Sequence, residues 1–426
     1  EGHDATKNDS YNKKEVDQPI ANKTGTLTEN GKFLQASENY KEGKRDPALI
    51  KVYRKIRMGV WVDMGFYDLI DGFTKFDGEL KIFKKYNFSK IKNFHKLEPN
   101  LIFHNENIVF FDDKGSILSF SKDSKLLWKT NNYSKEEKKI GPLISMMKKN
   151  NRLIVADNLA NTYVLNINNG KILWSKKNIA PFNSQIKIKD EKFFIVDARN
   201  TLNCFFIKNG DTCWTFSTEK SFINSVKKLS IVIKENFLIF NNSLGDITAV
   251  DLNEGSLLWQ FSSLNSQIYD EIMNFKTSNI ILNENSIYFS NNKNKFYSLD
   301  LLTGKVNWVQ NINSNLKSSI IGNIILSVSL DGFFFVIDKN TGNIIRITNL
   351  FNQEKLNKKQ DIYPTGFILN IEDLFISTNV GKLLIVNIEN GKIKKILNID
   401  NAKISRAFIQ KNNMYVIRNN SIIKMN

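Results

Sequence analysis

A short motif recurs along the chain at nearly constant spacing. The stretch "DLLTGKVNWVQ" at 300–310 has counterparts at 166–176, 206–216 and 251–261, each with a glycine four residues before a tryptophan. With a further tryptophan upstream, the spacings are 46, 40, 45 and 49 residues. The repeated tryptophans are Trp128, Trp174, Trp214, Trp259 and Trp308. A period of about 40–50 residues is the signature of a repeat architecture, and it limits the possible folds more than composition does.

Each repeat also contains apolar strands ahead of this hairpin. In residues 152–174, a first strand ends at an Asp-Asn turn, a second passes through Tyr163 and Leu165, and a third ends at Trp174. An earlier apolar strand precedes each unit, as at 229–233. Four short antiparallel strands per repeat predict the blade of a β-propeller.

The two ends of the repeat region predict how the ring closes. Residues 405–426 supply three strands and stop before a fourth, whereas 77–86 form a lone strand with Phe83 close to the tryptophan position. Pairing the two ends in one blade removes the open sheet edge. The sequence therefore predicts an all-β, eight-bladed propeller of four-stranded antiparallel blades over residues 77–426.

The tryptophans have two possible roles. They can fill the gaps between neighbouring blades, or they can stack on a ligand. Ligand-stacking rings would gather at one end of the channel, whereas these recur at one position of the outermost strand, which favours the structural role. The turn glycines are expected to adopt positive φ. They are Gly170, Gly210, Gly255, Gly304, Gly342 and Gly391, the last two followed by Arg346 and Lys395 in the tryptophan position.

The two cysteines flank one of these turns. If Asn209 and Gly210 form a two-residue loop, Phe206 lies opposite Cys213, and Cys204 is its diagonal neighbour. Diagonal neighbours lie roughly 7–8 Å apart, which is too far for an unstrained disulfide. We therefore expect two buried free thiols.

The repeat resembles that of the pyrroloquinoline-quinone (PQQ) type propellers. Within that superfamily, the eight blades, the closure of the ends and the final "NNSIIKMN" resemble the BamB family over about residues 77–426. The resemblance implies a non-catalytic scaffold of the outer-membrane β-barrel assembly machinery, located in the periplasm, without a cofactor. The alternatives are a PQQ-dependent quinoprotein dehydrogenase, or another cell-envelope propeller that binds a different protein or a glycan.

The dehydrogenase alternative needs residues that this sequence does not group together. Such enzymes resemble this chain in architecture but use calcium-binding acids, an aspartate base and often an adjacent cysteine pair. The cysteines here are separated, and the histidines are His3, His95 and His104, outside the blade interiors from 105 onward. We therefore expect no enzyme activity, no metal site and no cofactor.

Two long connections between blades, 216–228 and 261–276, combine apolar residues with polar and acidic ones. In the BamB family, connections in this part of the propeller bind a POTRA domain of BamA. The resemblance places partner-binding residues at Phe222, Ile223, Asn224, Ser225, Tyr269, Asp270, Glu271 and Asn274. The alternative is that these side chains fold back over the blade edge. Unfolded outer-membrane proteins are a further expected class of partner. The chain itself is expected to be a monomer within a complex.

The excess of 60 Lys and Arg over 43 Asp and Glu gives a formal charge of +17. The lysines are scattered singly, so we attribute the charge to composition, and without an RNP-like, zinc-finger or helix-turn-helix pattern we expect no nucleic-acid partner. The longest apolar stretch, 320–337, contains Asp331 and two glycines, so no transmembrane span is expected.

The first part of the chain differs from the repeats. Residues 1–55 are polar and aperiodic, which predicts a flexible extension. Residues 56–76 are rich in aromatic residues, which predicts a segment packing on or near the propeller. BamB proteins are usually tethered through a lipidated N-terminal cysteine, which this sequence does not contain. We therefore expect that an anchor has been removed, or that a partner holds the chain at the outer membrane.

Overall fold

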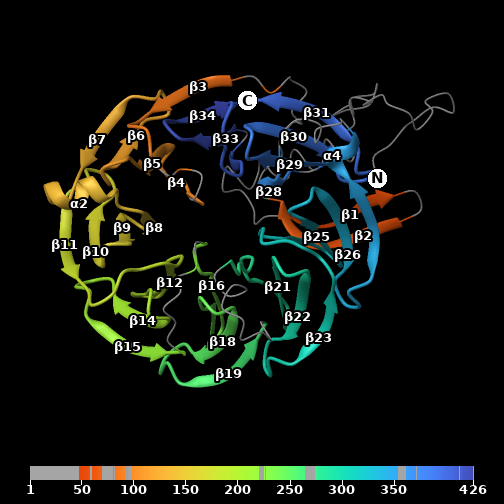
Figure 1. Cartoon of the computed structure of the whole chain (residues 1–426), viewed down its shortest axis with the longest axis horizontal. Coiled ribbons are helices and arrows are strands. Elements are labelled where there is room, and N and C mark those ends of the chain that lie inside the picture. Colours follow the sequence, from red (N-terminus) through yellow and green to blue (C-terminus); the bar gives the residue numbers. More distant parts are fainter. Residues whose placement is uncertain are drawn as a thin grey trace. The chain divides into compact units, whose positions relative to one another are not determined.

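Strand pairing organises residues 79–426 into eight four-stranded antiparallel sheets arranged around a central axis (Figure 1). This confirms the predicted propeller and its number of blades. The computed structural model describes residues 48–57, 60–69, 80, 82–92, 94, 98–219, 225, 227–263, 274–353, 361–370, 372–411 and 413–425.

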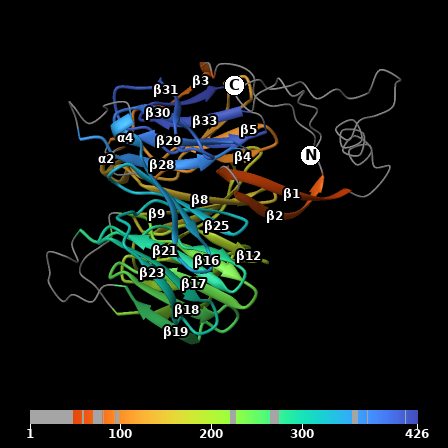
Figure 2. The same cartoon turned by 90° about the vertical axis from the view of Figure 1, so that its right-hand side faces the viewer.

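Seven blades are continuous in sequence, and the four strands of each run from the innermost to the outermost position. They are β4 (Ile102–His104), β5 (Asn107–Phe111), β6 (Ile117–Phe120) and β7 (Leu126–Thr130); β8 (Ile144–Lys149), β9 (Arg152–Asp157), β10 (Asn161–Asn166) and β11 (Ile172–Lys177); β12 (Lys187–Lys189), β13 (Lys192–Val196), β14 (Thr201–Phe206) and β15 (Thr212–Ser217); β16 (Ile231–Lys234), β17 (Phe237–Asn241), β18 (Asp246–Asp251) and β19 (Leu257–Ser262); β20 (Ile281–Asn283), β21 (Ser286–Asn291), β22 (Lys295–Asp300) and β23 (Val306–Gln310); β24 (Ser319–Ile321), β25 (Ile324–Val328), β26 (Phe333–Asp338) and β27 (Ile344–Asn349); and β28 (Pro364–Leu369), β29 (Asp373–Thr378), β30 (Lys382–Asn387) and β31 (Ile393–Asn398). In Figure 2, the last of these blades is seen with β31, β30, β29 and β28 in order.

The eighth blade joins the two ends of the propeller. Its strands are β32 (Phe408–Gln410), β33 (Asn413–Arg418), β34 (Ser421–Met425) and, outermost, β3 (Ile82–Asn87). Strand β3 pairs antiparallel with β34, from Ile82 opposite Met425 to Asn87 opposite Ser421. This pairing confirms the predicted closure.

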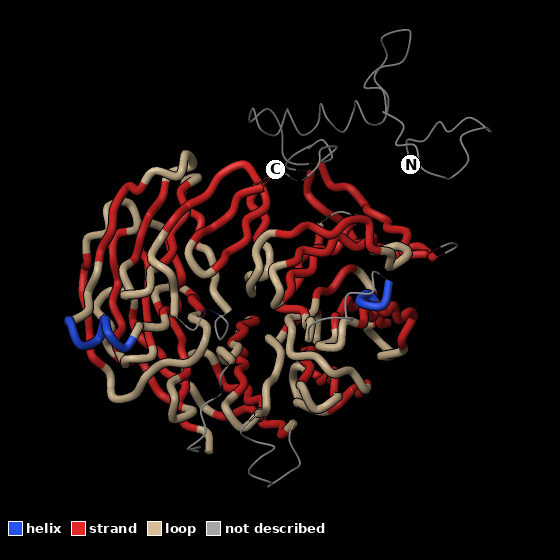
Figure 3. Tube along the Cα trace, turned by 45° about the horizontal axis from the view of Figure 1, so that its top comes forward, coloured by secondary structure: helices blue, strands red, loops and turns tan. Residues whose placement is uncertain are grey.

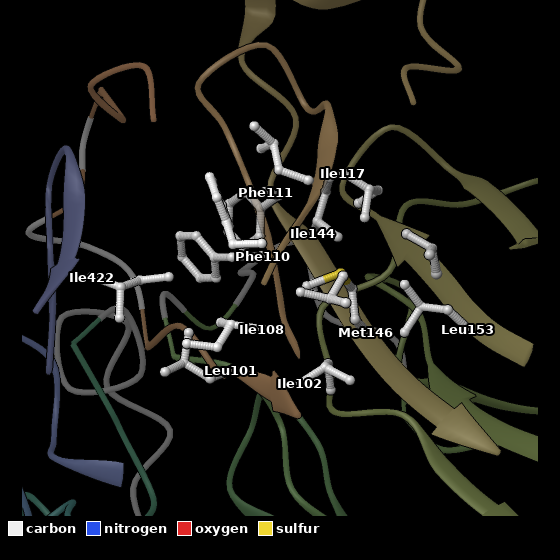
Figure 4. Close-up of a cluster of buried hydrophobic side chains, with 14 of the residues drawn as sticks. Leu101, Ile102, Ile108, Phe110, Phe111, Ile117, Ile144, Met146, Leu153 and Ile422 are labelled. Carbon is white, nitrogen blue, oxygen red and sulfur yellow. The ribbon is translucent and has the colours of Figure 1, made fainter. Parts of the chain in front are cut away.

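Burial follows the position of a strand within its blade. Middle strands such as β9 and β25 are buried on both faces, because each face packs against a neighbouring blade. Outermost strands such as β11 alternate between partly buried and exposed residues, because one face meets solvent. Figure 4 shows part of one core cluster, in which Phe110 of β5, Met146 of β8 and Ile422 of β34 join three blades.

The outer hairpin has a longer loop than the sequence suggested. Between β14 and β15, Phe206 N donates to Asp211 O at 2.9 Å and Gly210 N donates to Phe206 O at 2.9 Å. The loop thus has four residues and ends at Gly210, whose φ is +75°. The other turn glycines named from the sequence also have positive φ, between 69° and 74°, as predicted.

A β-bulge follows this loop and changes the expected register. Cys204 lies opposite Trp214 and Phe205 opposite Thr212, so Cys213 is the extra residue of the bulge. The predicted pairing of Phe206 with Cys213 is therefore wrong. Both cysteines are free as expected, but only Cys204 is buried and Cys213 is partly exposed. The same register shift precedes the tryptophan position in seven blades, where it re-aims the side chain.

The unit formed by residues 1–78 contains a two-stranded antiparallel sheet that the sequence did not suggest. Its strands are β1 (Ala48–Arg57) and β2 (Val60–Leu69), paired from Ala48–Leu69 to Arg57–Val60. Two short helices, α2 (Lys135–Ile140) and α4 (Leu350–Gln353), lie between blades of the other unit (Figure 3). Among the described residues, no helix has the length and apolar character needed to cross a membrane.

Candidate functional site

The structure describes only the ends of the two connections predicted to bind a partner, called here the docking loops (216–228 and 261–276). The following predicted site residues lie outside the described residues: Phe222, Ile223, Asn224, Tyr269, Asp270 and Glu271. Ser225 and Asn274 are described. Their positions define where each loop returns to the propeller.

Both ends are fixed to the turn that joins the second and third strands of a blade. Ser225 N donates to Ser243 Oγ at 3.4 Å, in the turn between β17 and β18. Asn292 Nδ2 donates to Asn274 O at 2.8 Å, in the turn between β21 and β22. The docking loops therefore return at equivalent points of adjacent blades and leave from the same face of the propeller.

The five repeated tryptophans contact the hairpin glycine of the next blade. The pairs are Trp128–Gly170, Trp174–Gly210, Trp214–Gly255, Trp259–Gly304 and Trp308–Gly342. A Cβ atom at these glycines would lie 2.5–2.8 Å from the nearest ring atom, closer than packing allows. The ring and the glycine thus form one interlocking contact, repeated at five blade junctions.

Most of these rings also donate a hydrogen bond across the junction. Nε1 of Trp259 donates to Leu301 O at 2.9 Å, and Trp128, Trp174 and Trp308 make the equivalent bond at 2.9–3.1 Å. Nε1 of Trp214 is buried and has no hydrogen-bond partner among the described residues. At the junction after that of Trp308, Arg346 takes the tryptophan position. Its Nη2 donates at 2.5 Å to Ile388 O, the carbonyl equivalent to Leu301 O. A guanidinium thus replaces the indole N–H.

The inner strands surround a second candidate site, the central channel. A cavity of about 450 Å³ is lined by residues from every blade or from the connection leading into it. Its apolar wall includes Phe111, Ile144, Met146 and Phe367. This volume is within the range of pockets that hold small molecules, about 300–1,000 Å³.

The charged residues of this lining are unbalanced. Among the described residues, six cations line the cavity against one carboxylate, that of Glu98. The six, called here the channel cations, are Lys187, Lys227, Lys228, Lys317, Lys403 and Arg406. Lys227 Nζ lies 3.5 Å from Glu98 Oε1, Lys228 Nζ donates to Ile144 O at 2.8 Å, and Arg406 Nη2 donates to Asn100 Oδ1 at 3.2 Å.

Desolvation in the channel disfavours the charged forms of these groups, although only Lys227 is buried and Lys317 keeps an exposed surface. Desolvation lowers the pKa of Lys228 to about 8, and the negative charge of Glu98 opposes this shift only in part. Desolvation also lowers the pKa of Lys317, and the nearby positive charges of Arg406 and Lys187 lower it further. Lys317, Lys187 and Arg406 therefore lie closely enough for their charges to repel one another.

This cluster was not predicted from the sequence, because the channel cations are far apart along the chain and the lysines are scattered singly. A signal was nevertheless present, since each lies within three residues of a buried serine leading into or within an innermost strand. These serines are Ser184, Ser230, Ser318 and Ser405. Aligning the repeats on this serine would have placed the cations together.

The described channel lining does not suit the calcium ion of the dehydrogenases. In the described part of the chain, no group of three or more His, Cys, Asp or Glu side chains could hold a metal ion. Calcium takes about six to eight oxygen ligands, whereas the described lining contributes the single carboxylate of Glu98.

Comparisons with known proteins give the same architecture. The family model "Outer membrane protein assembly factor BamB" matches residues 113–348. The crystal structure of BamB from Moraxella catarrhalis has a TM-score of 0.67 and 13% identity, with 82% of this chain and 99% of that chain covered. The Saccharomyces cerevisiae protein Sqt1 has a TM-score of 0.61 and 11% identity, covering 81% of this chain and 97% of its own. The designed protein Ika8 has a TM-score of 0.60 and 13% identity, covering 80% and 99%. No curated protein sequence matches the chain.

Proposed function

Because the chain belongs to the outer membrane protein assembly factor BamB family, we propose that it is a non-catalytic scaffold of the outer-membrane protein assembly machinery. In this role it docks on the periplasmic POTRA region of a BamA-type protein and assists the folding and insertion of β-barrel proteins. It acts as a monomer within that complex, in the periplasm at the outer membrane. Unfolded outer-membrane proteins are a second partner class.

The observation that carries this proposal is the equivalent placement of the two docking loops. The family match extends over both of them. The described loop ends at Ser225 and Asn274 are held by hydrogen bonds to corresponding turns of adjacent blades. A partner domain can therefore contact both loops at once on one face.

The residue types in the docking loops suit a protein interface. Phe222 and Ile223 supply apolar anchors, and Asp270 and Glu271 supply charge. Interface energy is concentrated in a few buried anchors, whereas charges at the rim act mainly on association rate and salt dependence. We therefore assign the larger share of the affinity to the 222–223 pair.

Titration calorimetry against the BamA periplasmic region tests the proposal. Replacing Phe222 and Ile223 by alanine together should weaken binding by about 2–4 kcal/mol. The Asp270→Ala, Glu271→Ala double variant should lose less affinity and show a weaker dependence on salt. The melting temperature of both variants should match that of the wild type.

A matched control lies on the opposite face of the propeller. Leu302 and Val306 are 59% and 45% exposed at an outer hairpin, so replacing both by alanine should leave BamA binding unchanged. If the 222–223 variant binds as tightly as the wild type, the docking surface is misplaced. If the wild type shows no affinity for BamA, the chain serves another envelope partner.

A further inference from the structure

We propose that the central channel binds a small organic oxyanion of multiple negative charge, bearing phosphate or carboxylate groups. The site is formed by the channel cations and the apolar wall described above. It includes Lys227 and Lys228 at the end of the first docking loop, but not the 222–223 pair proposed to contact the partner.

Among the described residues, positive charge exceeds negative charge inside the channel. Burying a cation is costly unless it is paired. Lys227, with 7% of its surface exposed, lies near Glu98, and the charge of Glu98 also acts on Lys228, Lys403 and Arg406. The charge of Glu98 thus acts on several cations at once, and a bound multivalent anion would lower the electrostatic energy of the site.

The cavity size favours a small molecule over a polymer. Its volume of about 450 Å³ matches a small organic ligand. Nucleic-acid recognition uses an extended surface of about 600 Å² or more, whereas these cations line one cavity. Phe111, Met146 and Phe367 in the wall can contact an apolar body of the ligand.

The donors suit both kinds of oxyanion. Arg406 presents a guanidinium, which bonds carboxylate or phosphate through two parallel N–H donors. Its Nη2 is held by Asn100 Oδ1 at 3.2 Å. Lysine ammonium groups bind either anion as point charges, and Lys228 is oriented by its bond to Ile144 O. The shared chemistry is therefore a multivalent oxyanion.

Glu98 has a specific place in this proposal. Its carboxylate lies near Lys227, and its negative charge acts on the neighbouring cations. It therefore offsets part of the positive potential that would attract an anion into the channel. Removing its charge should increase the affinity for the anion. If the carboxylate serves only to stabilise the fold, the Glu98→Gln variant should melt at a lower temperature and bind the anion no more tightly than the wild type.

The experiment measures binding of pyrophosphate and of citrate to the full chain by calorimetry, at constant ionic strength set with sodium chloride. We expect one site per chain for at least one of these probes. The Lys228→Gln, Arg406→Gln variant should bind about tenfold more weakly or worse, which corresponds to about 1.4 kcal/mol. The control, Lys171→Gln with Lys305→Gln, removes the same charge from two exposed hairpin lysines and should bind as the wild type does.

Tighter binding of pyrophosphate than of citrate would indicate a phosphate ligand, and tighter binding of citrate would indicate a carboxylate ligand. If the channel variant does not fold, the Glu98→Gln variant carries the test, because it should bind the anion more tightly than the wild type. Binding of neither probe overturns the proposal. Equal loss of binding in the channel and control variants also overturns it, since that result indicates general attraction to a basic surface.

Discussion

At the outer rim of the propeller, the same contact closes five consecutive blade junctions, whereas the central channel is lined by different side chains from each blade. At the rim, each tryptophan meets a glycine of the next blade, and all but Trp214 also donate to a backbone carbonyl there. In the channel, lysines from separate repeats gather around one glutamate. The rim contact is repeated between neighbouring blades, whereas the channel is a single site formed by residues that are distant in the sequence.

The difference follows from what each region contacts. A rim residue meets the neighbouring hairpin at each junction, so one residue type suits the five junctions that contain tryptophan. The channel residues face one another around the ring axis, so their packing does not require the same residue type in each blade. Charge that is costly to the fold can accumulate in the channel, where a bound anion would compensate for it. The following substitutions test this contrast between stabilising rim and destabilising channel.

The largest expected effect is at a tryptophan junction. Trp259 is 8% exposed and contacts Gly304, so Trp259→Ala should lower the free energy of unfolding by about 3–5 kcal/mol through the cavity it leaves. Chemical denaturation measures this change. The neighbouring Leu258 is 45% exposed, and Leu258→Ala serves as the control. A Trp259→Ala protein as stable as the control would contradict the structural role of the tryptophans.

A smaller loss is expected where arginine replaces tryptophan. Arg346 donates to Ile388 O and Glu389 O across the junction. Arg346→Ala should cost about 1.5–3 kcal/mol, the range for hydrogen bonds to charged groups. Arg346→Lys should recover only part of the loss, because lysine does not present two parallel donors. Full recovery by lysine would show that charge alone is sufficient at this junction.

The smallest effect has the opposite sign and lies in the channel. The pKa of Lys228 falls to about 8 in the folded chain, below its ordinary 10.5, so the unfolded chain binds more protons between these values and stability rises with pH there. Lys228→Met should therefore stabilise the protein at pH 7 by about 1–2 kcal/mol. The gain should disappear as the pH approaches 10.5.

Melting curves of the wild type and the Lys228→Met variant at pH 7 and pH 10 measure this difference. Lys305→Met provides the control, because Lys305 is an exposed hairpin residue. A stability gain of equal size at both pH values would show that the effect is due to packing and not to the charge.

Much of the fold could be predicted from the repeat. The positions of the glycine turns and tryptophans predicted eight blades, and the three strands before Asn426 and the one after Asp77 predicted their shared blade. The bulge at Cys213 and the four-residue loop before it were missed, because strict alternation and short loops were assumed. The β1–β2 sheet was missed because its strands lie outside the repeat.

The sequence by itself determined the blades, their number and their closure, because these depend on local patterns of turns and apolar residues that repeat along the chain. Only the tertiary structure decided which charged residues share a space. Lys187, Lys228 and Arg406 are separated by 41 and 178 positions in the sequence, and they line one cavity because the ring brings every innermost strand to a common axis. Ring closure is a property of all eight blades together, so no single segment carries the information that forms the channel.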